Sequence, residues 1–129
     1  MNNNKVIAII GSTQYLDKMK NYADELKKKG YTVHLPKTDF DDLTELEMCI
    51  ENLKRIKEAD EVHVFWDQRS LGTVFDLGMS FALGKKIKVV YLEQKTFANL
   101  LRQIEALKSF NNYMTLINEG DKKWNSNIG

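Results

Sequence analysis

The sequence is short of cysteine, of proline and of net charge, and these shortages exclude several classes of protein. Its one cysteine, Cys49, allows no disulfide within the chain and fits a reducing compartment. Nineteen basic and eighteen acidic residues leave a formal net charge of +1, so we expect no nucleic acid polymer as a partner. The one proline, Pro36, ends a predicted strand.

Long apolar runs are also absent. No segment approaches the ~20 apolar residues that a membrane-spanning helix needs. The first ten residues, MNNNKVIAII, lack the long apolar region and small-residue cleavage site of a signal peptide. A chain of 129 residues fits one domain with a full core. We therefore expect a cytoplasmic protein with no membrane partner.

Several common catalytic motifs are missing. The sequence has no GxGxxG after its first predicted strand, no GxxxxGK[ST] and no GxSxG. His34 and His63 lie in separate predicted strands with no cysteine cluster nearby, so we expect packed histidines and no metal site. Cys49 lies at an apolar position within a predicted helix, where a core role is expected.

Strand and helix patterns alternate along the chain. Short apolar runs predict strands at residues 5–10, 31–35, 61–66, 87–92 and 113–117. The predicted helices between them include one that begins with the capping-box pair Thr44 and Glu47 and one over Thr73–Leu83. These repeats predict a single α/β domain over residues 1–117, a doubly wound, Rossmann-like or flavodoxin-like parallel sheet of about five strands. Residues 118–129 form a polar C-terminal tail.

In such sheets, ligands bind beyond the carboxyl ends of the strands. The segment Gly11-Ser12-Thr13 follows the first predicted strand there and offers free backbone N–H groups and two hydroxyls. These groups suit an anion such as phosphate, and they suit an ordinary helix cap equally well. The segment Ser70-Leu71-Gly72-Thr73, after the third predicted strand, offers a second such helix start.

Asp76 is the one carboxylate in the apolar segment that follows, and two interpretations are open. Thr73 and Asp76 have the spacing of a capping box, which would place the acid near the positive end of a helix dipole. Alternatively, Asp76 projects into the cleft among apolar neighbours and attacks or stabilises an electron-poor carbon.

Three segments together resemble the nucleoside 2-deoxyribosyltransferase superfamily, which includes the 2′-deoxynucleoside 5′-phosphate N-hydrolases. They are GSTQY…ADELKKKGYTVHLP, IKEADEVHVF and SLGTVFDLGMSFALGKKI, and the likeness covers residues 5–92. The resemblance implies cleavage of the N-glycosidic bond between a base and a deoxyribose, with Asp76 as the attacking group. It implies that Ser12 and Ser70, with neighbouring amides of Gly11, Gly72 and Thr73, contact a sugar or a 5′-phosphate. It also implies that Tyr15 lies near the sugar.

The chain departs from that family at both catalytic carboxylates. The family's attacking glutamate is the shorter Asp76 here, and its helper aspartate falls on Asn52, which cannot take up a proton. Asp67, or an acid among residues 39–42, would then have to transfer the proton.

Two functions follow. The first is a glycosidic-bond enzyme without metal or organic cofactor, in which protonation activates the leaving base. The second is a non-catalytic protein that binds a nucleotide or a nucleotide-derived signal, as a sensor or a sequestering protein, although the small-molecule ligand of either protein could be a nucleoside or a nucleotide. Trp66 or Phe40 would form a wall for the base, although Trp66 fits the core equally well. The resemblance also implies a homodimer or a higher oligomer.

Overall fold

The computed structural model describes residues 5–36, 43–67, 69–93 and 98–107, and it contains one parallel four-stranded sheet. Its strands, in the order β2-β1-β3-β4, are β1 (Val6–Gly11), β2 (Thr32–His34), β3 (Glu61–Trp66) and β4 (Lys86–Leu92). Its helices are η1 (Thr13–Tyr15), α1 (Leu16–Lys28), α2 (Glu45–Glu58), α3 (Leu71–Ala82) and α4 (Ala98–Ala106). The predicted α/β class is confirmed, and the strand order is flavodoxin-like. The predicted fifth strand and the tail lie outside the described residues.

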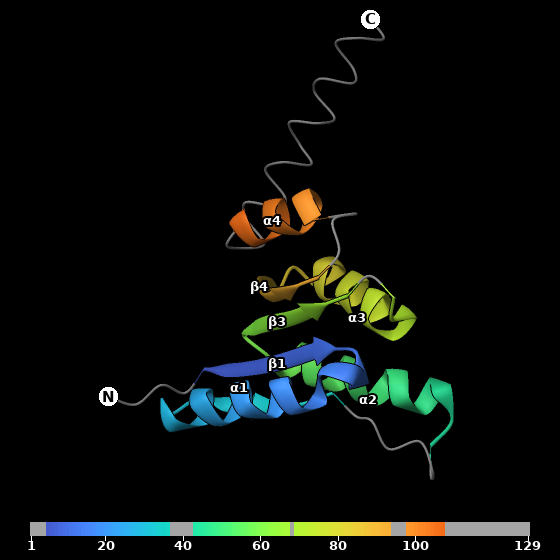
Figure 1. Cartoon of the computed structure of the whole chain (residues 1–129). Helices are drawn as coiled ribbons and strands as arrows, with labels where there is room; N and C mark the ends of the chain where they lie inside the picture. The colour runs from blue at the N-terminus through green and yellow to red at the C-terminus, as the bar shows by residue number, and fades with distance from the viewer. Residues whose placement is uncertain (1–4, 37–42, 68, 94–97, 108–129) are drawn as a thin grey trace, which may run out of the picture.

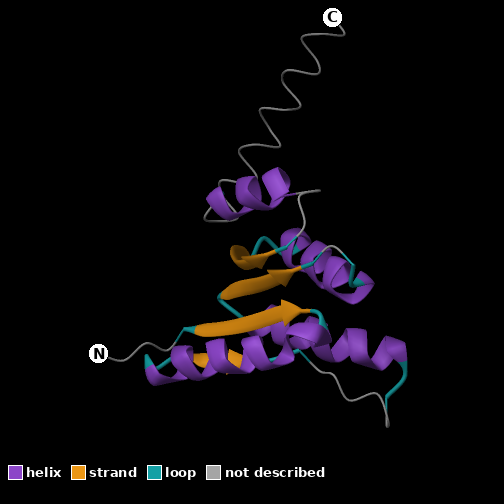
Figure 2. Ribbon diagram, in the orientation of Figure 1, coloured by secondary structure: helices purple, strands orange, loops and turns teal. Residues whose placement is uncertain are grey.

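Helices cover both faces of the sheet, as a doubly wound fold requires (Figures 1 and 2). Helix α1 packs on one face, where Met19 and Ala23 are buried against Ile9 and Phe65. Helices α2, α3 and α4 pack on the other face. The central strands are therefore covered on both sides, and all six residues of β3 are buried.

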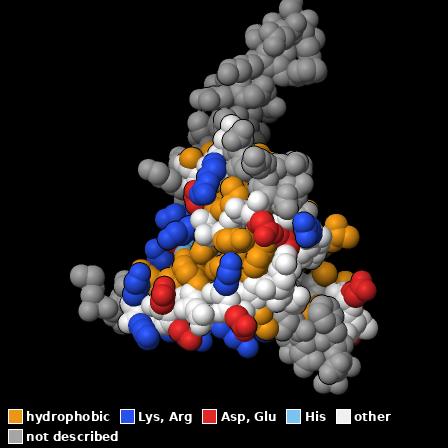
Figure 3. Space-filling model, in the orientation of Figure 1, with side chains coloured by type: hydrophobic (Ala, Val, Ile, Leu, Met, Phe, Trp, Pro, Cys, Tyr) orange, Lys and Arg blue, Asp and Glu red, His pale blue; other side chains and the backbone are white. Residues whose placement is uncertain are grey.

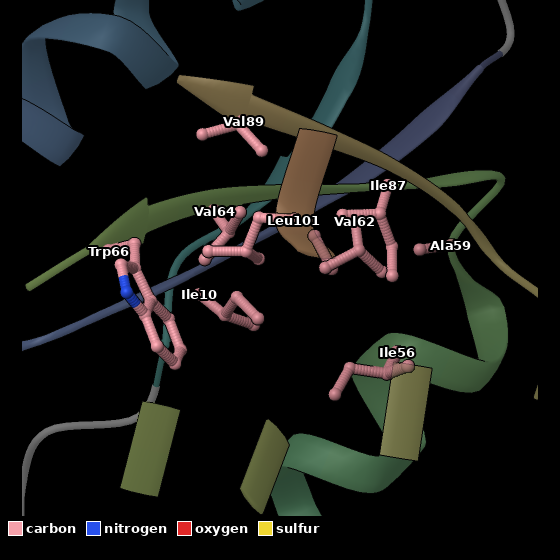
Figure 4. Close-up of a cluster of buried hydrophobic side chains, with 10 residues drawn as sticks. Ile10, Ile56, Ala59, Val62, Val64, Trp66, Ile87, Val89 and Leu101 are labelled. Carbon is pink, nitrogen blue, oxygen red and sulfur yellow. The ribbon is translucent and has the colours of Figure 1, made fainter. Parts of the chain in front are cut away.

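The larger core lies between the sheet and helices α2, α3 and α4 (Figure 4). Alternation along β3 sends Val62, Val64 and Trp66 to this side of the sheet. They meet Ile56 from α2 and Leu101 from α4, both 1% exposed. This core fixes α2 and α3 against the sheet and so sets the walls of the space between them.

Sequence signals for helix ends are present at three places. Thr44 and Glu47 form the predicted capping box at the start of α2, with N–O distances of 3.1 and 3.2 Å. Gly30 and Gly84 follow α1 and α3 with positive φ angles of 94° and 70°. At both glycines the next amide donates back into the last helical turn, which is the Schellman pattern that favours glycine.

The start of α3 differs from the prediction. The helix begins at Leu71 and not at Thr73, because Ser70 is the N-cap and its Oγ accepts a hydrogen bond from the Thr73 amide at 3.2 Å. Asp76 is therefore the sixth helical residue, beyond the free amides of the first turn. Of the two interpretations of Asp76, the capping box with Thr73 is therefore wrong.

The surface carries charges of both signs. On the face shown in Figure 3, acidic and basic side chains are interspersed, so no large region of one sign forms there. Among the described residues, no helix is both long enough and apolar enough to cross a bilayer.

Candidate functional site

A cavity of about 440 Å³ opens beside the carboxyl end of β1, between helices α2 and α3. This size is typical of small-molecule sites. β1 and β3 are neighbours whose chain connections leave in opposite directions, which is where flavodoxin-like sheets bind ligands. The cavity is lined by Gly11, Ser12, Thr13, Pro36, Glu45, Met48, Cys49, Asn52, Ser70, Gly72, Thr73, Phe75 and Asp76.

One face of helix α2 forms a wall of this cavity. Glu45, Met48, Cys49 and Asn52 follow one another at the spacing of a single helical face. Cys49 is therefore half-buried in the cavity wall and not in the core, which corrects the prediction made from its apolar position. The helical periodicity gives the correct face of the helix, but it does not distinguish a packed face from one that borders a cavity.

The opposite wall comes from the first turns of helix α3. The N-cap Ser70, Gly72, Thr73 and Asp76 all line the cavity. Thr73 and Asp76 are three residues apart on one face of the helix and are 2% and 7% exposed. The structure thus brings the two predicted helix starts together with Asn52 and Asp76 around one cavity.

The carboxyl group of Asp76 is buried, and no described residue compensates for its charge. The described residues give this carboxylate no hydrogen bond and no ion pair, although the Ser80 hydroxyl donates to the Asp76 backbone carbonyl at 2.7 Å. Burial disfavours the charged form and raises the pKa of Asp76 to about 6. A pKa shifted by burial is a common property of carboxylic acids at catalytic sites.

Asn52 and Asp76 also share a second, water-sized cavity of about 10 Å³ next to the first. Arg55, one turn further along α2, lines this smaller space as well. The side chain at the helper position implied by the family resemblance therefore does lie beside Asp76, and it is an amide in place of an acid.

Asp67, the suggested substitute for the helper acid, has a different position. Its Oδ1 accepts hydrogen bonds from the backbone amides of Arg69 and Ser70 at 2.9 and 3.2 Å, and its Oδ2 accepts one from the Gln14 side chain. Burial alone would raise the pKa of Asp67, but these hydrogen bonds outweigh it and lower the pKa. Asp67 does not line the cavity. It holds the turn that leads to Ser70.

Tyr15 and Trp66 also do not line the cavity. Tyr15 lies on the α1 side of the sheet, where its hydroxyl donates to Glu93 at 2.7 Å. Its ring meets the Tyr91 ring edge-on, with 4.9 Å between the ring centroids. Trp66 is 3% exposed and belongs to the larger core, as Figure 4 shows. The core interpretation of Trp66 is the one that the structure supports, because alternation along β3 turns its side chain inward.

Neither His63 nor the acidic loop after β2 adds a described residue to the cavity wall. His63 is buried, and its ring nitrogens pair with the Tyr22 hydroxyl at 2.7 Å and with Glu61 at 2.9 Å. No group of three His, Cys, Asp or Glu side chains in the described part of the chain could hold a metal ion. The proposed base wall Phe40 and the acids at 39, 41 and 42 lie outside the described residues.

Comparison with solved structures shows a shared fold. No protein-family model matches the sequence, and no curated protein matches it either. The chain shares its fold with a CMP N-glycosidase. That protein, BcmB from Clostridium botulinum, superposes with a TM-score of 0.61 at 21% identity, over 88% of this chain and 98% of the other.

Proposed function

We propose that this protein cleaves the N-glycosidic bond of a nucleoside or nucleotide and that Asp76 acts on the anomeric carbon. The observation that carries the proposal is the buried Asp76 carboxylate, which no described residue pairs, in the wall of a ligand-sized cavity at the carboxyl end of the sheet. The fold shared with a CMP N-glycosidase, and the resemblance of residues 5–92 to the deoxyribosyltransferase superfamily, support the same chemistry.

In the proposed reaction, a carboxylate oxygen of Asp76 bonds to C1′, or stabilises positive charge there, while the bond from C1′ to the base nitrogen breaks. The electron pair leaves with the base, which takes up a proton. Water or a second base then takes the sugar from Asp76. Among the described residues that line the cavity, Glu45 carries the other carboxylate. Glu45, in place of Asp67, is therefore the candidate that protonates the leaving base.

The start of α3 is the proposed contact for a 5′-phosphate. Ser70 caps this helix, Gly72 exposes its backbone, and Ser12 faces the same cavity from the end of β1. Free amides at a helix N-terminus favour an anion. This arrangement would orient the nucleotide with its sugar toward Asp76.

A ligand-binding protein without catalysis is the second candidate, and Asn52 is the observation that favours it. Asn52 lies beside Asp76, where the family resemblance implies an acid, and it cannot protonate the leaving base. The two candidates share the cavity and differ only in turnover.

Chromatography of reaction mixtures separates the two candidates. The purified protein is incubated with ribonucleosides, 2′-deoxyribonucleosides and their 5′-monophosphates, with and without a second free base as acceptor. Release of free base, or appearance of a new nucleoside, supports the enzyme. Ligand recovered unchanged from all mixtures, together with measurable binding, supports the binding protein and contradicts the proposed reaction.

Gly72→Ala is expected to weaken nucleotide binding at least about tenfold without loss of stability, because the added methyl intrudes where the ligand approaches the backbone. Gly72 lines the cavity, and a Cβ there would meet only Ser70 Oγ at 3.8 Å. Alanine in a helix raises the free energy of unfolding by up to about 1 kcal/mol relative to glycine.

Gly78→Ala provides the matched control, since Gly78 lies in the same helix, away from the cavity, with nothing within 4 Å of an added Cβ. Calorimetric titration with a nucleotide and thermal unfolding measure both effects. Equal affinity of the two variants would contradict the placement of the ligand at the start of α3.

We further propose that the protein forms a homodimer through the rim of this cavity. Seven large apolar side chains are exposed in the described residues, and five of them lie on α2 and α3: Leu46, Ile50, Leu71, Val74 and Phe75. Monomers rarely expose such a group together. The family resemblance implies a second copy of the chain as the occupant.

Leu71→Glu is expected to shift the protein from dimer to monomer, because Leu71 is 83% exposed between the lining residues Ser70 and Gly72, and a carboxylate buried there without a partner would oppose association. Leu100→Glu is the control, since Leu100 is 46% exposed on α4, away from the rim. Sedimentation velocity distinguishes the two species. A monomeric wild-type protein at micromolar concentration would contradict the proposed dimer.

A further inference from the structure

The hydroxyl of Thr73 is a polar group that the described residues leave without a partner. Thr73 is 2% exposed, and its Oγ1 is buried without a hydrogen bond, although its backbone amide is held by Ser70. Buried hydroxyls in folded proteins nearly always have a partner. Because Thr73 lines the large cavity, a group of the bound ligand is the natural one.

The position of Thr73 relative to Asp76 indicates which part of the ligand it meets. The two residues lie one turn apart on the same face of α3, and both line the cavity. A threonine side chain in a helix has two accessible χ1 rotamers, so its hydroxyl can turn toward a ligand at small cost. The hydroxyl therefore lies near the sugar carbon on which Asp76 acts.

The stereochemistry of a nucleoside then selects one sugar group. In a β-nucleoside the base projects from one face of the sugar ring, and the 2′- and 3′-hydroxyls of ribose project from the opposite face. A carboxylate that displaces the base must approach C1′ from the face opposite the base. The side chain next to Asp76 on that face meets the 2′-hydroxyl, which is bonded to the carbon adjacent to C1′.

We propose that Thr73 is a specificity-determining residue, whose hydroxyl hydrogen-bonds the 2′-hydroxyl of a ribose and favours ribonucleosides or ribonucleotides over their 2′-deoxy forms. The proposal rests on the proposed function, since it needs Asp76 at the anomeric carbon. A site that pairs a buried polar group with a substrate hydroxyl rejects the analogue that lacks it, because the protein group is then left unpaired. Hydrogen bonds to the 2-hydroxyl also strengthen in the transition state of glycoside cleavage.

The test compares kcat/KM for base release from a ribonucleotide and from its 2′-deoxy form, in the wild type and in Thr73→Val. Valine has the shape of threonine without the hydroxyl. We expect Thr73→Val to lower the ribonucleotide value about 10- to 100-fold and to leave the deoxyribonucleotide value nearly unchanged. The ratio of the ribonucleotide value to the deoxyribonucleotide value is calculated for the wild type and for Thr73→Val, and the two results are compared. This comparison cancels the different intrinsic lability of the two glycosidic bonds.

Two further variants separate recognition from a general disturbance. Thr73→Ser keeps the hydroxyl and should retain the wild-type preference. Thr13→Val removes a hydroxyl that lines the same cavity from the β1 side and should leave the preference unchanged. Equal losses on both sugars in Thr73→Val would overturn the inference and leave the proposed function standing.

A wild-type protein that releases no base from either sugar would overturn the proposed function separately. The same comparison is then made by calorimetric titration of the two nucleotides into Asp76→Asn protein, with and without Thr73→Val. A ratio of dissociation constants that Thr73→Val leaves unchanged would overturn the proposed recognition of the 2′-hydroxyl without any need for turnover.

Discussion

Asp76→Asn is expected to abolish base release and, at neutral pH, to make the protein more stable. The loss of turnover should exceed about 1000-fold, because an amide can neither attack C1′ nor balance positive charge there. The gain in stability has a different origin. The wild-type protein must hold an ionised carboxylate that is 7% exposed and that no described residue pairs, whereas asparagine carries no charge.

The pH dependence fixes the sign of this effect. Burial raises the pKa of Asp76 from 3.8 to about 6, so between these values the folded protein holds a proton that the unfolded chain has released. The stability that comes from Asp76 is therefore present at about pH 4 and below, and it falls as the pH rises to about 6. The whole difference is about 3 kcal/mol.

Denaturant unfolding from pH 4 to pH 8 measures this difference. Asp76→Asn should exceed the wild type by up to about 3 kcal/mol at pH 7, and the gain should vanish near pH 4. Asp24→Asn is the control, because Asp24 is exposed on α1, and it should change neither stability nor base release. A loss of stability in Asp76→Asn at pH 7 would show that the carboxylate has a structural partner and would contradict its description as an unpaired acid.

Glu61→Gln is expected to have the opposite combination of effects, a large loss of stability without loss of activity. Glu61 is 8% exposed at the amino end of β3, the end of the sheet away from the cavity. Its carboxylate accepts from Lys5 at 2.8 Å and from His63 at 2.9 Å, and Lys86 lies at 3.4 Å. Breaking these contacts should cost about 2 kcal/mol, after allowance for the water around the half-exposed lysines.

The pKa of Glu61 gives the pH window for this loss. Burial would raise the pKa, but the hydrogen bonds from His63 and Lys5 and the charge of Lys86 outweigh it and lower the pKa to about 2. The stability from Glu61 is therefore present above about pH 4.5 and is lost as the pH falls through about 2. The contributions of Asp76 and Glu61, taken together, are therefore largest near pH 4–5.

Unfolding of Glu61→Gln, followed from pH 2 to pH 7, tests this account. Its deficit should shrink as the pH falls below 4.5, while its kcat/KM for base release stays at the wild-type value. Glu51→Gln is the matched control, since Glu51 pairs with Lys54 at 3.4 Å on the surface of α2, where an ion pair contributes little. A deficit that persists unchanged at pH 2 would contradict the assigned role of the carboxylate.

The sequence predicted the elements of the fold well where local signals agree. The strand 61–66 is observed as Glu61–Trp66, and the capping box of Thr44 and Glu47 begins α2. The start of α3 was misplaced by two residues because Ser70 and Thr73 are both good caps. The choice between them depends on Asp67, whose hydrogen bonds to the Arg69 and Ser70 amides shape the preceding turn. The spacing of apolar residues gives no information about these hydrogen bonds of Asp67.

The candidate site was predictable only in part. The rule that ligands bind at the carboxyl ends of parallel strands correctly brought Ser12, Ser70 and Asp76 to one cavity. Tyr15 lies just after β1 and Trp66 is the last residue of β3, but both side chains pack into the cores on the two faces of the sheet. Alternation along β3 accounts for the core position of Trp66, whereas the direction of Tyr15, beyond the end of β1, depends on tertiary packing that the sequence pattern does not encode.

The most direct test of the central claim is base release by the wild type and by Asp76→Asn, side by side. Both proteins, at high concentration, are incubated at pH 7.5 with a ribonucleoside 5′-monophosphate and its 2′-deoxy form, and free base is quantified by chromatography over hours. The account predicts release by the wild type and none by Asp76→Asn. Unfolding measurements establish that the Asp76→Asn protein is folded. Equal release by the two proteins, or none by the wild type, would contradict a catalytic role for Asp76.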